Sequence, residues 1–390
     1  MGAMAPIPQP GTVIAAMSGG VDSAVAALLL LRAGHRVQGL YMSNWDEEDA
    51  YCTSAEDFQD ARRVCDTLDI PLHTVSFAAQ YRERVFTHFL AEYAAGRTPN
   101  PDVLCNREIK FGVCLEYMRR LGAERIATGH YARVEHGAHG ADQMPAWLLK
   151  ARDTDKDQSY FLHAVAPAAL AMTIFPLGEL RKAEVRRLAR TAGLGVHDKR
   201  DSTGICFIGE RPFADFLARY VARTPGPIET AEGRVVGEHA GLAVHTLGQR
   251  SGLGLGGRRG AADAPWYVAA KDVARNALIV VQSENHPLLM AASFDVEAVH
   301  WLAEALPHRE CGVKTRYRQR DLPCRLDASP DGRWRVTLGE PARAVTPGQY
   351  AVFYDGDRCL GGGVIARTFA GTEPAVRGIA YNDAISAEGS

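Results

Sequence analysis

Apolar and polar positions follow two different patterns along the chain. In the first third, short apolar runs at residues 12–17 and 36–42 are separated by an Ala- and Leu-rich stretch, 21–33, that favours a helix. Strands that alternate with helices of this length form βαβ units and a parallel sheet covered on both faces. We therefore predict an α/β fold with a doubly wound, Rossmann-like parallel sheet. The other elements predicted here are helices at 55–68, 81–95 and 108–121 and strands at 72–77 and 125–128.

The pattern changes after Tyr131, first to a hairpin containing Gly and His and then to a helix-rich stretch with helices at 182–192 and 213–222. The sequence Thr224-Pro225-Gly226-Pro227 favours a linker, because its two prolines and its glycine stop a helix. We place a domain boundary there, and a second one at Asn285-His286-Pro287.

Short alternating strands, separated by turns rich in Pro, Gly and Asp, occupy residues 293–368. This pattern is typical of a small β-barrel or sandwich, and we predict a barrel. The predicted organisation is a tail at 1–10, a catalytic α/β domain at 11–223, a small central domain at 224–285, the barrel at 286–370 and a tail at 371–390.

The composition agrees with a soluble protein of two or three domains. The 390 residues are 46% hydrophobic and 23% charged, and no apolar run approaches the ~18 residues of a membrane helix. The formal net charge of −2 gives no overall signature of nucleic-acid binding, although local patches still bind phosphates. Eight cysteines without a Cys-x-x-Cys pair argue against a disulfide scaffold or a zinc ribbon, so we expect a protein of the reducing cytoplasm.

The sequence Ser18-Gly19-Gly20-Val21-Asp22-Ser23 lies between the first predicted strand and the first predicted helix. Its glycines let the backbone approach a phosphate, and the helix presents free N–H groups and a positive dipole end. The loop lacks the lysine of a Walker A motif, which argues against transfer of a terminal phosphate. Asp22 is suited to Mg²⁺, directly or through water. The alternative is that the glycines only turn the chain and that Asp22 or Ser23 caps the helix.

Two of the cysteines stand in polar, turn-rich surroundings. Cys105 precedes the helix predicted to begin near Glu108, and Arg107 is close in sequence, so we expect an exposed thiol with a lowered pKa. Asp102, three residues earlier, can take up or deliver a proton. Cys206 lies in the polar stretch 201–209, next to Lys199 and Arg200, where a thiolate is again favoured.

The alternative for any cysteine is a small buried residue that fills a core. We predict this role for those within helical patterns and in the β region, and leave Cys52 open. The cysteines predicted to be buried are Cys65, Cys114, Cys311, Cys324 and Cys359.

The loop at 18–23 resembles that of the PP-loop family, whose members bind ATP there and cleave it between the α and β phosphates. The resemblance implies adenylation of a substrate. The family includes amidotransferase-type synthetases and tRNA-modifying enzymes, so the loop alone does not define the substrate.

Further motifs make the chain similar to the tRNA-specific 2-thiouridylases of this family, from about Gly11 to about Thr368. The resemblance implies that Cys105 is the nucleophile, Cys206 carries a persulfide, Asp102 is the acid/base, and Cys105 and Cys206 form a transient disulfide. The motifs are 17–23, Asn44-Trp45, 100–111, Thr128-Gly129-His130-Tyr131, 156–160 and 201–210. The departures are Ala16, where glycine is expected, the variable segment 135–147 and the tail beyond Thr368.

The same resemblance implies binding residues, with ATP and Mg²⁺ as cofactors, the anticodon loop of tRNA and a persulfide sulfur-carrier protein as partners, and a monomer. The implied nucleotide contacts are Ala16, Met17, Ser18, Gly19, Gly20, Val21, Asp22, Ser23, Met42 and Gly129, with Asp22 as the Mg²⁺ ligand. The implied contacts to the target base are Asn100, Pro101 and Asp102, and those to the rest of the tRNA are His130, Lys156, Asp157, Gln158, Arg316, Tyr317 and Gln349.

Residues 314–320 form a basic segment of the predicted barrel. As a strand, this segment would place Lys314, Arg316, Arg318 and Arg320 on one face and Tyr317 on the other. Four cations in a row suit a phosphate backbone, and an aromatic ring stacks on a base. The residues alone are equally consistent with a strand face that is only solvated. The resemblance favours the interpretation that this segment contacts tRNA. A second basic stripe, Arg181, Lys182, Arg186, Arg187 and Arg190, is typical of a solvated helix face.

Two rival functions remain at this point. A PP-loop amidotransferase or ligase acting on a small molecule has no need for Cys105 or Cys206. A non-catalytic, ATP-dependent tRNA-binding protein binds tRNA without changing its sulfur content. Both rivals leave the two activated cysteines unexplained.

Overall fold

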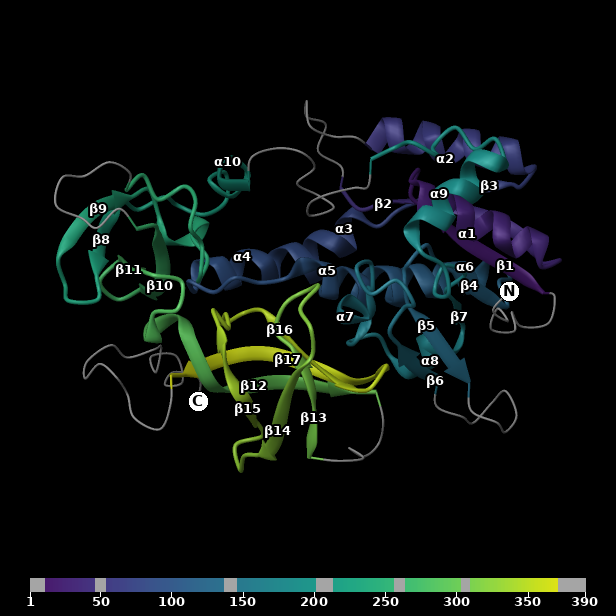
Figure 1. Cartoon of the computed structure of the whole chain (residues 1–390). Coiled ribbons are helices and arrows are strands. Elements are labelled where there is room, and N and C mark those ends of the chain that lie inside the picture. Colours follow the sequence, from purple (N-terminus) through teal and green to yellow (C-terminus); the bar gives the residue numbers. More distant parts are fainter. Residues whose placement is uncertain are drawn as a thin grey trace, which may run out of the picture.

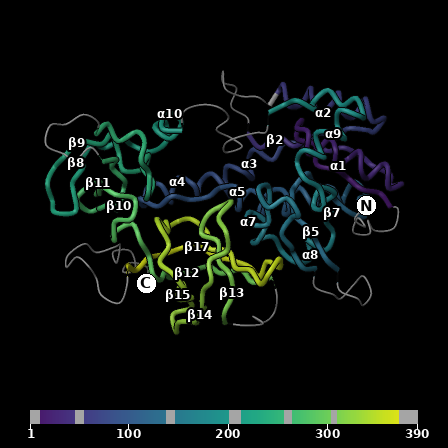
Figure 2. Tube along the Cα trace, in the orientation of Figure 1, coloured from purple at the N-terminus to yellow at the C-terminus, as the bar shows by residue number. Residues whose placement is uncertain are grey.

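Three sheets organise the chain. The computed structural model describes residues 11–45, 54–136, 146–200, 213–255, 264–302 and 309–370. Figure 1 shows a parallel sheet with its helices on the right, a four-stranded sheet on the left and a barrel below, and a row of helices crosses between them. The tube in Figure 2 traces the same path from the N-terminal sheet to the barrel. No helix in these described ranges is long and apolar enough to cross a membrane.

The N-terminal sheet confirms the predicted doubly wound parallel fold. Its order is β3-β2-β1-β4-β7, and every neighbouring pair is parallel. Successive residues of the central strand β1 point to opposite faces, so Val13 packs beneath α1 while Ile14 joins the core on the other side. The strands are β1 (Thr12–Met17), β2 (Arg36–Ser43), β3 (Leu72–Ser76), β4 (Arg125–Ala127) and β7 (Thr173–Ile174), and α1 (Val21–Arg32), α2 (Ser54–Leu68) and α9 (Lys182–Thr191) contribute to the first of these two cores.

The helix predicted at 108–121 begins earlier than expected, at Pro101. The Asn100 side chain accepts a hydrogen bond from the backbone N–H of Asp102 at 3.2 Å, and Pro101 takes the first helical position. Both residues are strong helix starters, and the sequence interpretation treated them as turn residues. The helical segments of this region are α3 (Ala78–Tyr81), a π-helical stretch (Arg82–Phe86), α4 (Thr87–Ala94), α5 (Pro101–Leu104), a second π-helical stretch (Cys105–Val113) and α6 (Cys114–Arg120).

The middle of the chain differs from prediction at two places. The helix expected at 213–222 is only α10 (Phe213–Leu217), and the second half of the expected linker, Gly226-Pro227, belongs to β8. Proline is tolerated there because β11 pairs with β8 only from Ile228 onward. The other elements are the short helices α7 (Ser159–Leu162) and α8 (Pro167–Ala171), 3-10 turns at Leu242–Val244 and Pro287–Leu289, and the sheet β10-β11-β8-β9, with β8 (Gly226–Thr230), β9 (Val235–His239), β10 (Trp266–Asp272) and β11 (Ala277–Gln282).

The C-terminal strands form the predicted barrel. β12 pairs with both β15 and β17, which closes six antiparallel strands. The predicted hairpin after Tyr131 is also present, and its strand β6 pairs with β17 at Leu149 and Arg358. The barrel strands are β12 (Met290–Trp301), β13 (Glu310–Lys314), β14 (Leu322–Ala328), β15 (Trp334–Arg343), β16 (Tyr350–Asp355) and β17 (Arg358–Phe369), and the hairpin strands are β5 (Arg133–His136) and β6 (Ala146–Leu149).

The strand predicted at 314–320 is wrong beyond its first residue. β13 ends at Lys314, and the chain then turns, with Arg318 in the left-handed region at φ 64°. The Gln319 side chain accepts a hydrogen bond from the backbone of Thr315 at 2.7 Å, which stabilises this turn. The four cations therefore do not share a strand face. Lys314 is buried, whereas the three arginines are exposed.

A single buried carboxylate lies at the closure of the barrel. Asp295 of β12 is directly opposite Arg335 of β15 and Arg367 of β17, and it makes ion pairs with both, the second at 2.6 Å. Burial by itself acts to raise the pKa of Asp295, but the hydrogen bonds and charges of the two arginines outweigh burial and hold that pKa below its usual value.

We expect Asp295→Asn to lower the free energy of unfolding by about 1–3 kcal/mol, since it removes the charge that both arginines share. Because the folded pKa is below the unfolded value of ~3.9, this stabilisation is present above about pH 4 and is lost as the pH falls further. Urea unfolding at pH 7 and at acidic pH measures both effects. Asp327→Asn, which affects exposed pairs with Arg309 and Arg325, is the matched control and is expected to change stability by less than about 0.5 kcal/mol. Equal losses for the two variants would contradict a role in closure.

Candidate active site

The loop at 18–23 lies at the carboxyl end of the central strand β1, where open α/β sheets bind their ligands. Gly20 occupies the N-cap of α1 in an extended conformation, and no side chain of the described residues caps this helix end. The first N–H groups of α1 are thus available to an anion. The alternative that Asp22 or Ser23 caps the helix is wrong, because Asp22 pairs elsewhere and the Ser23 hydroxyl donates to the Gly20 carbonyl at 3.0 Å.

Close packing explains two of the glycines. Gly19 has φ 73°, and a Cβ there would lie 2.2 Å from the carbonyl oxygen of Asp57, at the start of α2. A Cβ on Gly129, just after β4, would come within 2.8 Å of the backbone of Asp22 and Ser23. The backbone of the loop at 18–23, from here on called the phosphate loop, is therefore held between α2 and the residues just after β4. Neither glycine position has space for a side chain.

Lys182 is a site residue that the sequence interpretation missed. Its ammonium lies 2.7 and 2.8 Å from the two carboxylate oxygens of Asp22, and the Tyr131 hydroxyl donates to the same carboxylate at 2.8 Å. We had assigned Lys182 to a solvated stripe, but its side chain is only 13% exposed. The sequence signal that could have found Lys182 was the missing lysine of the loop, because a loop that binds phosphates without its own lysine needs a cation from elsewhere in the chain.

The pairing of Asp22 bears on the metal that the resemblance implies. Both of its carboxylate oxygens already accept hydrogen bonds from Lys182, so a directly bound Mg²⁺ would have to displace the ammonium. Described residues contain no cluster of three metal-ligating side chains. The donor set at the loop, with its N–H groups, the Ser18 hydroxyl and Lys182, fits the phosphates of a nucleotide better than it fits a metal alone.

The other implied nucleotide contacts line the same edge. Ala16 of β1 and Met42 of β2 pack against the core on the face of the sheet opposite α1, and Val21 is buried at the start of that helix. Met17 belongs to the core beneath α1.

Cys105 lies inside the helix that begins at Pro101 and is only 2% exposed, so the expected exposed thiol is wrong. Its neighbour Arg107 points to solvent and pairs with Glu108 at 2.7 Å. Lys110, one turn further on, is the cation whose charge acts on Asp102. Burial outweighs this charge and raises the pKa of Asp102 above its usual value.

The remaining cysteines agree with prediction in most cases. Burial raises the pKa of Cys65 to about 11 and that of Cys114 and Cys359 to about 12, which makes these thiols unreactive. Cys324 is also buried, but Cys311 is half-buried. Cys206, the motif at 201–210 around it and Cys52 lie outside the described residues.

His130 connects the phosphate loop with the Cys105 helix. Gly129, which precedes it, packs on the loop backbone, and the His130 ring lies 5.9 Å from the ring of Phe111. Burial, with the nearby Lys110, holds the pKa of His130 well below its usual value, so the ring is neutral and bonds to the Thr128 hydroxyl at 2.8 Å. A neutral His130 can take part in hydrogen bonds but carries no positive charge.

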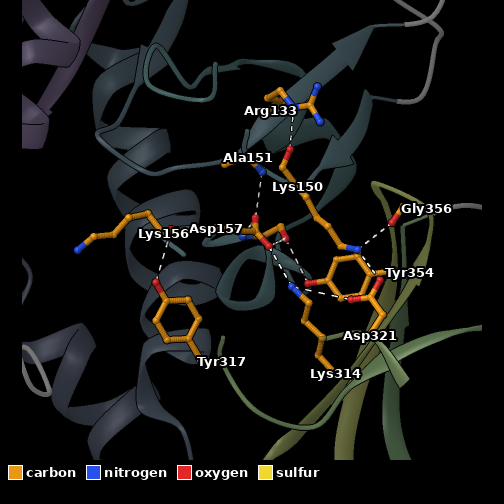
Figure 3. A network of polar contacts seen from close by, with 11 residues as sticks. Arg133, Lys150, Ala151, Lys156, Asp157, Lys314, Tyr317, Asp321, Tyr354 and Gly356 are labelled. Carbon is orange, nitrogen blue, oxygen red and sulfur yellow. Dashed lines mark hydrogen bonds and ion pairs between the residues drawn. The ribbon is translucent and has the colours of Figure 1, made fainter. Parts of the chain in front are cut away.

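Asp157, an implied tRNA contact, has its side chain turned into the protein (Figure 3). Its carboxylate accepts hydrogen bonds from Ala151 and Ser159 at 3.0 to 3.2 Å. It also forms an ion pair with Lys314 of the barrel at 3.2 Å. Lys150 forms a similar ion pair with Asp321. Two lysine–aspartate pairs therefore link residues 150–157, called the β6 region, to β13 and its turn.

The residues beside Asp157 are placed by backbone contacts. The side chain of Gln158 accepts from the Tyr131 backbone at 2.9 Å, and the Tyr317 hydroxyl donates to the Lys156 carbonyl at 3.5 Å. In Figure 3 the Lys156 side chain points away from this network. Lys156 is half-buried, and its side chain takes no part in the lysine–aspartate pairs of Figure 3.

The implied tRNA residues of the barrel all make contacts within the protein, and they differ in how far they are exposed. Arg316 donates to the Ala344 carbonyl at 2.8 Å, and Tyr317 packs its ring 4.6 Å from that of Phe161. Gln349 donates to the Thr98 carbonyl at 2.7 Å, next to the start of the Cys105 helix. Arg316 remains exposed despite its contact, and Tyr317 and Gln349 are half-buried.

A parallel sheet with an uncapped helix and a glycine loop at its carboxyl edge defines a nucleotide-binding α/β protein. The family model described as "tRNA methyl transferase HUP domain" matches residues 11–210, and models for a "tRNA methyl transferase PRC-barrel domain" and an "Aminomethyltransferase beta-barrel domain" match 214–282 and 291–365. Relatives that are 54 to 58% identical to this chain are named tRNA-specific 2-thiouridylase, and the chain belongs to this family.

Relatives with that name cover almost the whole chain. The protein from Chromohalobacter salexigens is 58% identical over 93% of this chain and 94% of its own. Those from Pseudomonas aeruginosa and Shewanella baltica are 55% and 54% identical, over 94% and 92% of this chain and 97% of each relative. Among solved structures, a U34-tRNA thiolase from Methanococcus maripaludis covers 50% of this chain and 60% of its own at a TM-score of 0.33 and 16% identity, a likeness too slight to bear on function.

We expect Gly19→Ala to weaken ATP binding by roughly tenfold or more, because the added methyl group meets the Asp57 carbonyl and forces the loop to move. Equilibrium binding of ATP to the folded variant measures this. Gly122→Ala is the matched control, since Gly122 also has a positive φ, 85°, but has open space around it among the described residues. The control is expected to cost about 1–2 kcal/mol of stability and to leave ATP affinity unchanged. Normal ATP affinity in Gly19→Ala would contradict the importance of the close packing between Gly19 and Asp57.

We expect Lys314→Met to lower the free energy of unfolding by about 3 kcal/mol, because it leaves the buried Asp157 carboxylate without its counter-charge. Arg318→Met, an exposed cation in the turn after Lys314, is the control and should change stability by less than about 0.5 kcal/mol. Urea unfolding curves of the two variants test the difference. A loss of tRNA affinity without any loss of stability in Lys314→Met would instead assign the lysine to the tRNA.

Proposed function

We propose that this protein catalyses the ATP-dependent 2-thiolation of the wobble uridine of tRNA. The observation that carries the proposal is the short path of contacts from the phosphate loop, through Gly129, His130 and Phe111, to the helix that holds Asp102 and Cys105. Family membership agrees with it, since the relatives are named tRNA-specific 2-thiouridylases. The rival functions leave this helix without a purpose.

The nucleotide is held at the loop in this proposal. The N–H groups of α1 and the Ser18 hydroxyl bind the phosphates of ATP, and Lys182 supplies the positive charge that the loop lacks. Ser23 keeps the loop in shape, because its hydroxyl donates to Gly20 and accepts from the Ser18 backbone. Asp22 would be the loop's own carboxylate for Mg²⁺, and the ion would neutralise charge on the phosphates. Ala16, Met42 and Gly129 border the nucleotide at the sheet edge.

The target uridine is flipped out of the anticodon loop, because its 2-carbonyl cannot be reached while the base is stacked. Asn100, Pro101 and Asp102 at the helix start contact the base. The 2-oxygen of the base attacks the α-phosphorus of ATP, and pyrophosphate leaves. The adenylated oxygen is now a good leaving group. In the later substitution at carbon 2 of the base, the carbon–oxygen bond breaks and a carbon–sulfur bond forms.

Sulfur arrives on Cys206 as a persulfide from a carrier protein. In one route its outer sulfur attacks the activated carbon directly, and Cys105 then attacks the Cys206 sulfur and breaks the S–S bond. In the other route Cys105 attacks the Cys206 sulfur first, and the released hydrosulfide attacks the carbon. AMP leaves with the former 2-oxygen, and the two cysteines end as a disulfide that a cellular thiol reduces. Asp102, with its raised pKa, exchanges the protons of these steps.

We propose that the tRNA lies across Lys156 and the exposed turn after β13, where Arg316 and neighbouring arginines face solvent. Tyr317 and Gln349 place this turn and the Cys105 helix relative to each other, with His130 close to the base. The protein acts as a monomer in the cytoplasm, where tRNA and reducing thiols are present.

The test is incubation of the protein with unmodified tRNA, ATP, Mg²⁺ and a persulfide donor, followed by nucleoside analysis. We expect 2-thiouridine to form only when all components are present, and Cys105→Ser and Cys206→Ser to lower turnover by more than about a hundredfold. Cys311→Ser, a half-buried thiol of the barrel, is the control that keeps activity. Repeated turnover by Cys206→Ser with a persulfide carrier alone would overturn the proposal, as would pyrophosphate release that depends on ammonia or an amino acid and ignores tRNA.

A further inference from the structure

Two thiols face each other across neighbouring strands of the barrel, apart from the site described above. Cys311 of β13 is directly opposite Cys324 of β14, and their Sγ atoms are 3.6 Å apart. Cys324 belongs to the barrel core, and Cys311 packs against that core from a half-buried position. One thiol of the pair is therefore accessible to small molecules and the other is protected.

The strand register gives this pair a spacing that suits a disulfide. The backbone of Leu326 donates to the Arg309 carbonyl at 2.8 Å, two residues along each strand, so Cys311 and Cys324 again occupy a hydrogen-bonded pair. The Cα atoms of such pairs are about 5.5 Å apart, within the range of about 4.4–6.8 Å that disulfides span. The sulfurs, 3.6 Å apart as thiols, must approach to the roughly 2.0 Å of a disulfide bond.

We propose that Cys311 and Cys324 form a second, reversible thiol–disulfide site, which is oxidised by exchange with a low-molecular-weight disulfide such as oxidised glutathione. The assignment rests on this chain's own geometry and does not depend on the proposed function.

The exchange occurs in two steps. Cys311, the more exposed thiol, attacks the small disulfide as its thiolate, forms a mixed disulfide and releases one glutathione thiolate. The hydrogen bond with Cys311 and burial raise the pKa of Cys324, so this thiol loses its proton to solvent only in the second step. It then attacks the Cys311 sulfur and displaces the second glutathione. Two protein thiols are oxidised, and one glutathione disulfide is reduced to two thiols.

The cross-link would join both sides of one turn. Cys311 and Cys324 are 13 positions apart and flank the segment that begins with the buried Lys314 and ends with Asp321, the partner of Lys150. Arg316, Arg318 and Arg320 are exposed between them. A disulfide at the base of this hairpin limits how far the turn opens, because it restrains the open conformations more than the closed one.

The first test equilibrates the full-length protein with glutathione redox buffers and maps its disulfides by mass spectrometry without reduction. We expect a peptide linking Cys311 to Cys324 that disappears on addition of excess reduced glutathione. Cys359→Ser, which removes a buried thiol of β17, should leave this peptide unchanged. Cys324→Ser should stop the reaction at a glutathione adduct on Cys311. Thiols that stay reduced in oxidised glutathione, or a lasting adduct on Cys311 of the unmodified sequence, would overturn the proposal.

The second test measures limited tryptic cleavage after Arg316, Arg318 and Arg320, with the fragments reduced before analysis. We expect cleavage at these bonds to be slower by roughly three- to tenfold in the oxidised protein, since cleavage requires the turn to open. The Cys311→Ser variant should lose this dependence on oxidant. Equal cleavage rates in oxidised and reduced protein, with the cross-link present, would contradict the restraint of the turn.

Discussion

The start of the Cys105 helix is fixed between two domains, and the rest of the site depends on that constraint. Val103, Leu104 and Cys105 belong to the same buried core as Tyr350 and Val352 of the barrel. The backbone just before the helix is held as well, because Thr98 donates to the Pro347 carbonyl at 3.2 Å and its carbonyl accepts from Gln349. The barrel is therefore part of the structure that positions the Cys105 helix, in addition to carrying the turn for which we propose contact with tRNA.

Buried charge reinforces this arrangement. Asp157 and Asp321 each pair with a lysine across the boundary between the β6 region and β13 with its turn, and the ring of Tyr354 lies 4.5 Å from the Lys150 ammonium. Leaving one of these charges unpaired costs more than an exposed ion pair contributes, which favours a single docking of the two parts. At the other end of the site, Lys182 and Asp22 form a similar pair at 2.7 Å.

The sequence allowed accurate prediction where the structure is local. The strand, glycine loop and helix at 12–33 and the closed barrel follow from periodicity and turn residues, and the motifs identified the family. Lys182 and Asp157 were misjudged, because their partners are distant in sequence, and only the fold reveals which charges meet. The burial of Cys105 has the same origin: the cap at Asn100 was treated as a turn, and the barrel that covers the helix is contributed by residues near 350.

The central step of the proposed mechanism is the attachment of AMP to the 2-oxygen of the uridine before sulfur replaces it. The most direct measurement uses tRNA whose wobble uridine carries ¹⁸O at position 2, in a single turnover with ATP, Mg²⁺ and a persulfide donor. Mass spectrometry of the released nucleotide should find the ¹⁸O in AMP, in an amount equal to the 2-thiouridine formed. Label that appears in water, or AMP that remains unlabelled while 2-thiouridine accumulates, would contradict the account.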